Sequence, residues 1–132
     1  MFNYVENSPV NAKQIADLRQ SVGWPRMEES YLDPRMTFYF HIACYHEDQL
    51  IGYVDSVSNE VTDAYIQDLT VHPDYQGKGI GTELMNRMIR GLKERNIYMI
   101  SVIYGNAELA DFYKRFGFFQ MLCGQMPTYE VE

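Results

Sequence analysis

The sequence of 132 residues predicts a single α+β domain, residues 1–132, in which helices pack against one mixed β-sheet. Three observations predict this class. The apolar fraction of 46% and the charged fraction of 22% are those of an ordinary globular protein. Segments with helical periodicity alternate with short β-rich runs, and neither a repeat nor a low-complexity linker interrupts them. The length is sufficient for one hydrophobic core without disulfides or a structural metal.

Two helices are expected at the start of the chain. In "NAKQIADLRQSV" (11–22) apolar residues recur at helical spacing, and Asn11 can act as the N-cap. In "PRMEESYL" (25–32) Pro25 stands at a helix start, and the following Asp-Pro ends that short helix.

Three strands are expected next. "TFYFHIACYH" (37–46) is rich in β-formers, and "EDQ" turns it into "LIGYVDSVS" (50–58), which predicts an antiparallel hairpin. "DAYIQDLTVH" (63–72) is a third strand that ends before Pro73.

A helix and a strand follow. "TELMNRMIRGLKERN" (82–96) carries an apolar stripe at helical spacing. "IYMISVIY" (97–104) is nearly all apolar, which is typical of a strand that is buried on both faces.

The remaining elements complete the predicted order α-α-β-β-β-α-β-α-β-β. "NAELADFYKRFGF" (106–118) reads as a helix that Asn106 caps and Gly117 ends. The segments 118–124 and 127–132 are expected to be terminal strands.

The stretch "HPDYQGKGIG" (72–81) joins the third strand to the next helix and holds glycines at positions 77, 79 and 81. Free N–H groups and the helix dipole make such a turn an anion site, so we expect it to bind phosphate. The spacing fits neither a Walker loop nor a dinucleotide fingerprint. It fits Gln-x-x-Gly-x-Gly, with Gln76, Gly79 and Gly81.

These residues resemble the GNAT superfamily of N-acetyltransferases. "LTVHPDYQGKGIGTELM" is similar to the acetyl-CoA-binding motif of that family, and "NAELADFYKRFGF" is similar to its second signature. The resemblance covers residues 50–120 well and the first 35 residues only in the order of elements. It implies the GNAT fold, a mixed and mostly antiparallel central sheet flanked by helices, with an order of the type β-α-α-β-β-β-α-β-α-β.

The resemblance also implies that acetyl-CoA is the co-substrate. Leu69, Thr70 and Val71 would line the pantetheine arm, which pairs with backbone groups like an added strand. The N–H of Leu69 would be an oxyanion donor to the thioester oxygen. Asn106 would reach the pantetheine. The pyrophosphate would be held by Gln76, Gly77, Lys78, Gly79, Ile80, Gly81 and Thr82.

Acetyl transfer needs a base for the amine proton and an acid for the departing thiolate. Tyr113 matches the acid tyrosine of the family. Where some family members carry a glutamate as base, this chain has Tyr65 and Ser101, so that assignment does not transfer. Asp68 is our first choice of base. Asp63 and a water relay through Tyr65 remain open.

The acceptor amine is expected between the first two helices and the sheet. Trp24 lies in the break between those helices, where family members line the acceptor pocket, and a role as a hydrophobic anchor fits it equally well. Tyr31, Phe40 and Tyr65 are the other substrate-binding candidates. An aromatic ring can stack on an ammonium group.

The net charge of −7 makes nucleic acid a poor partner and would suit a cationic small molecule, although it equally serves solubility. No apolar run reaches the length of a membrane span, and no close Cys/His cluster suggests a metal. We expect a cytoplasmic N-acetyltransferase that acts on a small primary amine. A non-catalytic acyl-CoA sensor and a protein N-terminal or lysine acetyltransferase are the alternatives, and a homodimer is left open.

Overall fold

The computed structural model describes residues 1–129 and contains one five-stranded sheet in the order β1-β2-β3-β4-β5. All neighbouring strands are antiparallel except β4 and β5, which are parallel, so the predicted mixed and mostly antiparallel sheet is confirmed. The elements are β1 (Asn3–Glu6), α1 (Ala12–Ser21), α2 (Glu28–Leu32), β2 (Ile42–His46), β3 (Gln49–Ser58), β4 (Asp63–Val71), η1 (Pro73–Tyr75), α3 (Ile80–Glu94), β5 (Met99–Val102), η2 (Ala107–Leu109) and α4 (Ala110–Lys114).

The chain divides into two compact units. The first, Met1–Val102, holds the whole sheet and the helices α1 to α3. The second begins at Ile103 and holds η2 and α4.

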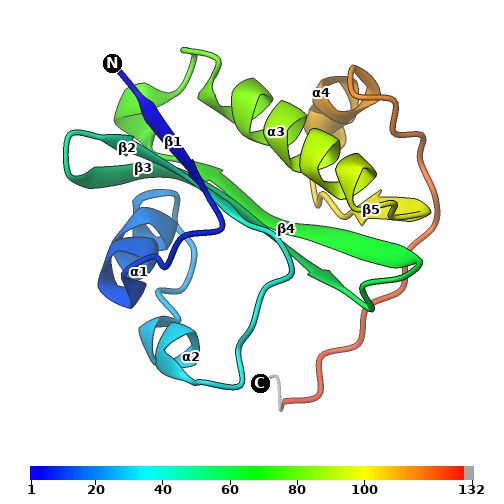
Figure 1. The fold of residues 1–132 in the computed structure, drawn as a ribbon, viewed down its shortest axis with the longest axis horizontal. Coiled ribbons are helices and arrows are strands. Elements are labelled where there is room, and N and C mark those ends of the chain that lie inside the picture. The colour runs from blue at the N-terminus through cyan, green and yellow to red at the C-terminus, as the bar shows by residue number, and fades with distance from the viewer. Residues whose placement is uncertain (130–132) are drawn as a thin grey trace. The chain divides into compact units, whose positions relative to one another are not determined.

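Within the first unit, α1 and α2 cover one face of the sheet and α3 covers the other (Figure 1). On the α1 face, Ile15 and Leu18 pack against Ala43, Leu50 and Tyr53. Residues of a strand alternate between its two faces, so the apolar positions of β2 and β3 serve both layers. The buried positions of α3 are Ile80, Leu84, Met85, Met88, Gly91 and Leu92.

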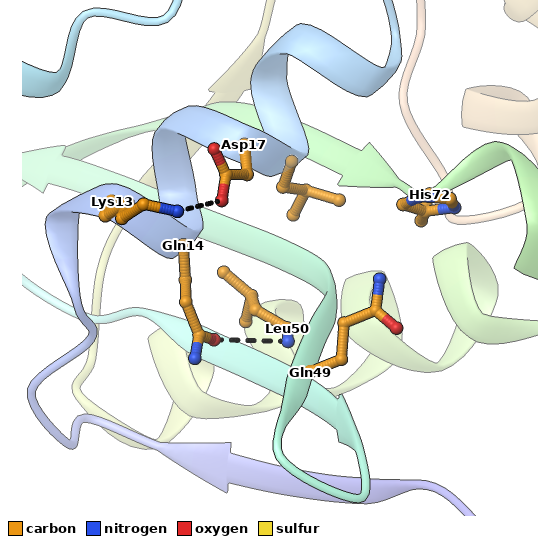
Figure 2. Close-up of a pocket in the computed structure, with 7 residues that line it drawn as sticks. Lys13, Gln14, Asp17, Gln49, Leu50 and His72 are labelled. Carbon is orange, nitrogen blue, oxygen red and sulfur yellow. Dashed lines mark hydrogen bonds and ion pairs between the residues drawn. The ribbon is translucent and has the colours of Figure 1, made fainter.

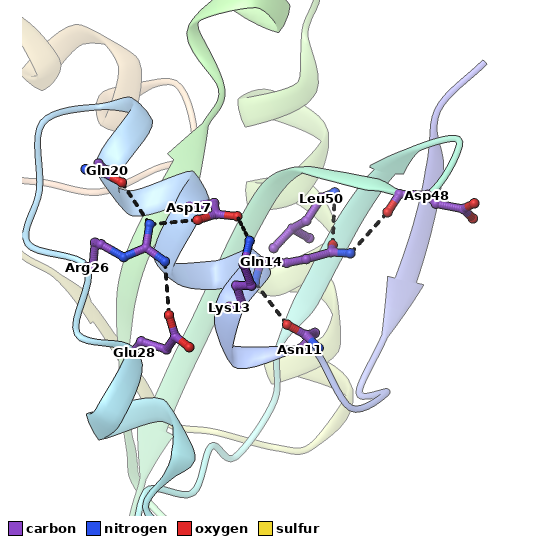
Figure 3. A network of polar contacts seen from close by, with 9 residues as sticks. All are labelled: Asn11, Lys13, Gln14, Asp17, Gln20, Arg26, Glu28, Asp48 and Leu50. Atoms are coloured by element: carbon purple, nitrogen blue, oxygen red, sulfur yellow. Dashed lines mark hydrogen bonds and ion pairs between the residues drawn. The ribbon is translucent and has the colours of Figure 1, made fainter.

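Polar contacts tie α1 to the β2–β3 turn and to the start of α2 (Figure 3). The Gln14 side chain accepts from the Leu50 N–H at 3.2 Å and donates to the Asp48 carbonyl at 3.2 Å. Arg26 donates to Asp17 at 2.7 Å, so the segment that leads into α2 is anchored on α1. These contacts hold the first two helices as one layer.

The N-terminal predictions hold with three corrections. The Asn11 carboxamide accepts from the Gln14 N–H at 3.1 Å and caps α1 as expected. The second helix begins at Glu28 and not at Pro25, because Met27 adopts a left-handed conformation with φ 56°. Residues 37–41 lie outside the strand, and β1 precedes α1, as the family order implied and the residue patterns did not.

The C-terminal predictions need more correction. β5 was expected to be buried on both faces, but its residues alternate between exposed and half-buried, because it is the edge strand of the described sheet. The predicted helix 106–118 is shorter, with η2 followed by α4, and Gly117 lies beyond it with φ 98°. Residues 118–129 form no strand, and residues 130–132 of the last predicted strand lie outside the described residues.

Of the helices in residues 1–129, none combines the length and the apolar content needed to cross a membrane.

Candidate functional site

The glycine turn between β4 and α3 contains two residues in a left-handed conformation. Gly77 and Gly79 have φ values of 79° and 83°, which side chains with a Cβ atom rarely adopt. Gly79 is the N-cap residue of α3, and no side chain caps this helix end. The first N–H groups of α3 are therefore available for an anion. The Gln76 side chain donates to the Val71 carbonyl at 3.0 Å and fixes the start of the turn.

β4 extends beyond its parallel partner. The pairing of the two strands runs from Asp63 with Met99 to Ile66 with Val102, where β5 ends. From residue 67 to Val71, the edge of β4 that faced β5 has no strand beside it within the described chain. Leu69, Thr70 and Val71 lie on this stretch, and an extended ligand arm could pair with such an edge.

A β-bulge interrupts β4 at the same place. Tyr53 pairs with Thr70 and Asp55 pairs with Gln67, so two residues of β4 oppose the single residue between them on β3. One of the two is Asp68, whose φ is 59°, a left-handed conformation that aspartate tolerates better than most residues. Bulges of this kind redirect side chains and are frequent beside active sites.

The bulge brings Asp68 into contact with the first two helices. The Tyr31 hydroxyl donates to Asp68 Oδ2 at 2.9 Å, and Arg19 Nη1 lies 3.3 Å from the same oxygen. The Arg19 guanidinium carbon also lies 5.4 Å from the ring centroid of Trp24 and 5.9 Å from that of Tyr31. Trp24, Tyr31 and Asp68, which sequence reasoning proposed separately, thus meet around Arg19.

Asp55 lies on β3 beside this group and is fully buried, with 0% exposure. Neither of its carboxylate oxygens has a hydrogen-bond partner among the described residues. Burial, reinforced by the charge of Asp68, raises the pKa of Asp55 to about 8. The Tyr53 hydroxyl, in a looser contact than a hydrogen bond, and the Arg19 guanidinium oppose this rise.

The same surroundings keep the Tyr31 hydroxyl protonated. Burial raises the pKa of Tyr31 well above its ordinary value, and the charges of Asp68 and Asp55 raise it further. Tyr31 is therefore a stable hydrogen-bond donor to Asp68.

The other predicted residues lie elsewhere. Tyr65 is half-buried on β4, opposite Val57 of β3 and Ser101 of β5. Asn106 and Tyr113 belong to the second unit, so their roles stay predictions. There, Asn106 Oδ1 accepts from the Glu108 N–H at 2.9 Å and caps η2.

Tyr113, the predicted acid, is buried in α4. Its ring stacks on that of Tyr104, with centroids 4.7 Å apart and planes at 16°. Such a stack gives the Tyr113 ring a packing role.

Sequence reasoning missed Arg19 and Asp55. The signal for Asp55 was a carboxylate in the middle of the β-rich run "LIGYVDSVS", where a buried charge is unfavourable. Arg19 had no comparable signal, because an arginine on a helix with polar neighbours is usually exposed.

A hollow of about 340 Å³ opens between α1, the start of β3 and the end of β4 (Figure 2). The Lys13 ammonium and the Asp17 carboxylate at its rim pair at 3.1 Å. None of the predicted site residues lines it. Its lining consists of Lys13, Gln14, Asp17, Leu18, Gln49, Leu50 and His72.

Over residues 1–129, no three His, Cys, Asp or Glu side chains come together in a way that could hold a metal ion.

Comparisons with known proteins match most of the chain. The model of the acetyltransferase (GNAT) family matches residues 6–118. The chain is 32% identical over 117 residues to an uncharacterized N-acetyltransferase, ycf52, of Gracilaria tenuistipitata var. liui, which covers 85% of this chain and 64% of that protein. It is 30% identical over 121 residues to the histone acetyltransferase TAP1 of Glycine max, which covers 83% of this chain and 52% of that protein. The chain thus spans between half and two thirds of the length of these relatives.

A solved structure supports the fold. The crystal structure of a Staphylococcus aureus protein of unknown function superposes with a TM-score of 0.85 at 24% identity, and covers 98% of this chain and 100% of that one.

Proposed function

Because the chain belongs to the GNAT family of acetyltransferases, we propose that it transfers the acetyl group of acetyl-CoA to a primary amine by direct attack on the thioester in a ternary complex. One observation carries the proposal. A glycine turn with an uncapped helix N-terminus stands directly after a stretch of β4 beside which the described residues place no other strand, so phosphate groups and an extended arm can bind side by side.

We assign the cofactor contacts to the backbone of this region. The N–H groups from Gln76 to Thr82 would hold the pyrophosphate, and the edge of β4 from Leu69 to Val71 would pair with the pantetheine arm. Support comes from the left-handed glycines of the turn and from the exposed side chain of Lys78, which adds a positive charge there.

Two groups would act on the reacting thioester. The Leu69 N–H, at the bulge, would donate a hydrogen bond to the oxygen that becomes negatively charged as the amine attacks. Tyr113 would give its proton to the departing thiolate, since a phenol with a pKa near ~10 is a suitable acid for a thiolate of similar basicity.

The acceptor would bind where Trp24, Tyr31 and Asp68 meet. Trp24 is 38% exposed and Tyr31 is half-buried, so both can offer an aromatic surface to a small molecule. Tyr65 lies three residues before Asp68 on the same strand and would be a further contact. We favour a small-molecule amine as the acceptor, because these aromatic surfaces can stack on an ammonium group.

A protein acceptor is the second candidate, because one relative is named a histone acetyltransferase. The test is release of free thiol from acetyl-CoA in the presence of small amines, or of peptides with a lysine or a free N-terminus. Turnover with small amines supports the proposal, and turnover with peptides alone moves the acceptor to a protein. Tight binding of acetyl-CoA without turnover on any amine would make the chain an acyl-CoA sensor.

A cytoplasmic location and a homodimer remain predictions. Imaging of the tagged protein tests the first, and sedimentation with and without coenzyme A tests the second.

A further inference from the structure

We propose that Asp55 and Asp68 form a carboxyl pair in which Asp68 meets the acceptor amine and takes its proton, while the buried carboxyl of Asp55 acts on Asp68 through its charge. This inference rests on the proposed function and deepens it by naming the base. Asp68 is a catalytic residue, because it would touch the substrate. Asp55 is a positioning residue, because it acts through Asp68.

Asp68 is the member that a substrate can reach. Its side chain is 31% exposed, and the two contacts that it makes within the described chain, with Tyr31 and Arg19, are both to Oδ2. Oδ1 is therefore the oxygen left to meet an amine. The bulge turns Asp68 toward α1 and α2. It lies in the part of β4 that extends beyond the end of β5. An amine at Oδ1 would thus stand beside the edge that we assign to the thioester arm.

Asp55 is the buried member. Residues two apart on a strand share a face, so Asp55 lies on the same side of β3 as Tyr53, which packs against α1. A buried carboxyl with neither oxygen hydrogen-bonded is rare, because such a group loses its hydration without replacement. Here the arrangement has a use, since a buried negative charge on Asp55 favours a proton on the neighbouring carboxyl.

The groups that face Asp55 come from each element packed around it. They are Arg19 of α1, Tyr31 of α2, Asp68 of β4 and Tyr53 of its own strand. Just before β2, the His41 ring lies 6.2 Å from that of Tyr53. Of these four groups Arg19 is the only cation, and it forms an ion pair with Asp68. The negative charge of Asp68 therefore acts on Asp55.

The proton balance is complete. The acceptor ammonium gives one proton to the pair and becomes a neutral amine, whose lone pair forms the N–C bond to the acetyl group. The C–S bond then breaks, and the thiolate takes a proton from Tyr113. The nitrogen loses its second proton, which restores Tyr113, and the pair releases the first proton to water.

The pair predicts a particular pH dependence. The base is competent when both carboxyls are ionised, so kcat/KM of the wild type should rise as the pH passes through about 8, where Asp55 loses its proton. General bases contribute ~10²–10⁴-fold, so we expect Asp68→Asn to lower kcat/KM by about 10²-fold or more. Asp55→Asn should lower it as well and should remove the rise near pH 8.

The experiment combines rates with a direct titration. We would measure kcat/KM against pH for the wild type, Asp55→Asn and Asp68→Asn, with Asp48→Asn as the matched control in the exposed β2–β3 turn. Carbon-13 NMR of aspartate-labelled protein would follow the Asp55 carboxyl in the wild type and in Asp68→Asn. We expect the titration of Asp55 to move to lower pH when the charge of Asp68 is removed.

Three results would overturn the pair. An Asp55→Asn variant with unchanged rates and an unchanged pH profile would show that Asp55 has no part in the reaction. An Asp55 titration that does not move in Asp68→Asn would show that the two carboxyls are not coupled. If the wild type turns over no amine at all, the proposed function itself fails and the pair loses its role with it, whereas the first two results leave the acetyltransferase activity in place.

Discussion

Replacing Asp55 by asparagine keeps the shape of the side chain and removes its charge. In the folded protein this carboxyl has 0% exposure and no hydrogen-bond partner in the described chain. In the unfolded chain it is hydrated. The difference in unfolding free energy between this variant and the wild type therefore reports the cost of ionising one buried carboxyl. The measurement does not depend on enzyme activity.

The size of the effect follows from the pKa of Asp55, which rises from 3.8 to about 8 on folding. The folded protein binds this proton more tightly than the unfolded chain does. The proton therefore stabilises the fold fully below pH 3.8, and this stabilisation is lost as the pH rises toward about 8. Each pH unit in this window lowers the free energy of unfolding by about 1.4 kcal/mol. From pH 5 to pH 7 the loss is about 3 kcal/mol, a large part of the ~5–15 kcal/mol of a typical domain.

The assay is urea unfolding at a series of pH values from 5 to 7.5. We expect the difference in unfolding free energy between Asp55→Asn and the wild type to grow with pH by about 1.4 kcal/mol per unit. Asp48→Asn, an exposed control, should run parallel to the wild type. Parallel curves for the wild type and Asp55→Asn would refute the reasoning, because they would mean that Asp55 titrates alike in the folded and unfolded states.

Three further predictions concern the reaction. Gly79→Glu puts a negative charge at a left-handed position of the turn, so coenzyme A affinity by calorimetry should fall more than tenfold, or about 1.4 kcal/mol, while Gly79→Ala reports the backbone strain alone. Unchanged affinity in folded Gly79→Glu would remove the phosphate assignment. Tyr113→Phe should lower kcat by ~10²–10⁴-fold with its melting temperature unchanged, whereas Tyr104→Phe, on the stacked ring, should stay active. Full activity of Tyr113→Phe would end the acid assignment. Trp24→Ala should raise the KM of the amine about 2–5-fold, as expected for ~0.5–1 kcal/mol of ring contact, and should leave that of acetyl-CoA unchanged. An equal rise in both values would make Trp24 a packing residue.

Local sequence signals predicted most of the first unit. Helix α1 and its cap, the β2–β3 hairpin, β4 and α3 follow from periodicity, turn residues and capping, because these interactions lie within a few residues of one another. The predictions failed where a segment depends on distant partners. The apolar stretch around β5 predicts a strand that is buried on both faces, yet Tyr98 just before it is 81% exposed, since the burial of a strand is set by the neighbours that it acquires.

The sequence by itself determined the family, the glycine turn and the identity of the residues proposed for the cofactor. These features depend on the spacing of residues from Gln76 to Thr82, which sets the conformation of the backbone locally. Only the tertiary structure decided that Arg19 joins Trp24, Tyr31 and Asp68. These contacts depend on a bulge in the pairing of β3 with β4 and on two helices that pack over it. Burial likewise gives Asp55 its raised pKa, and burial is a property of everything that surrounds a side chain, which no pattern along one strand records.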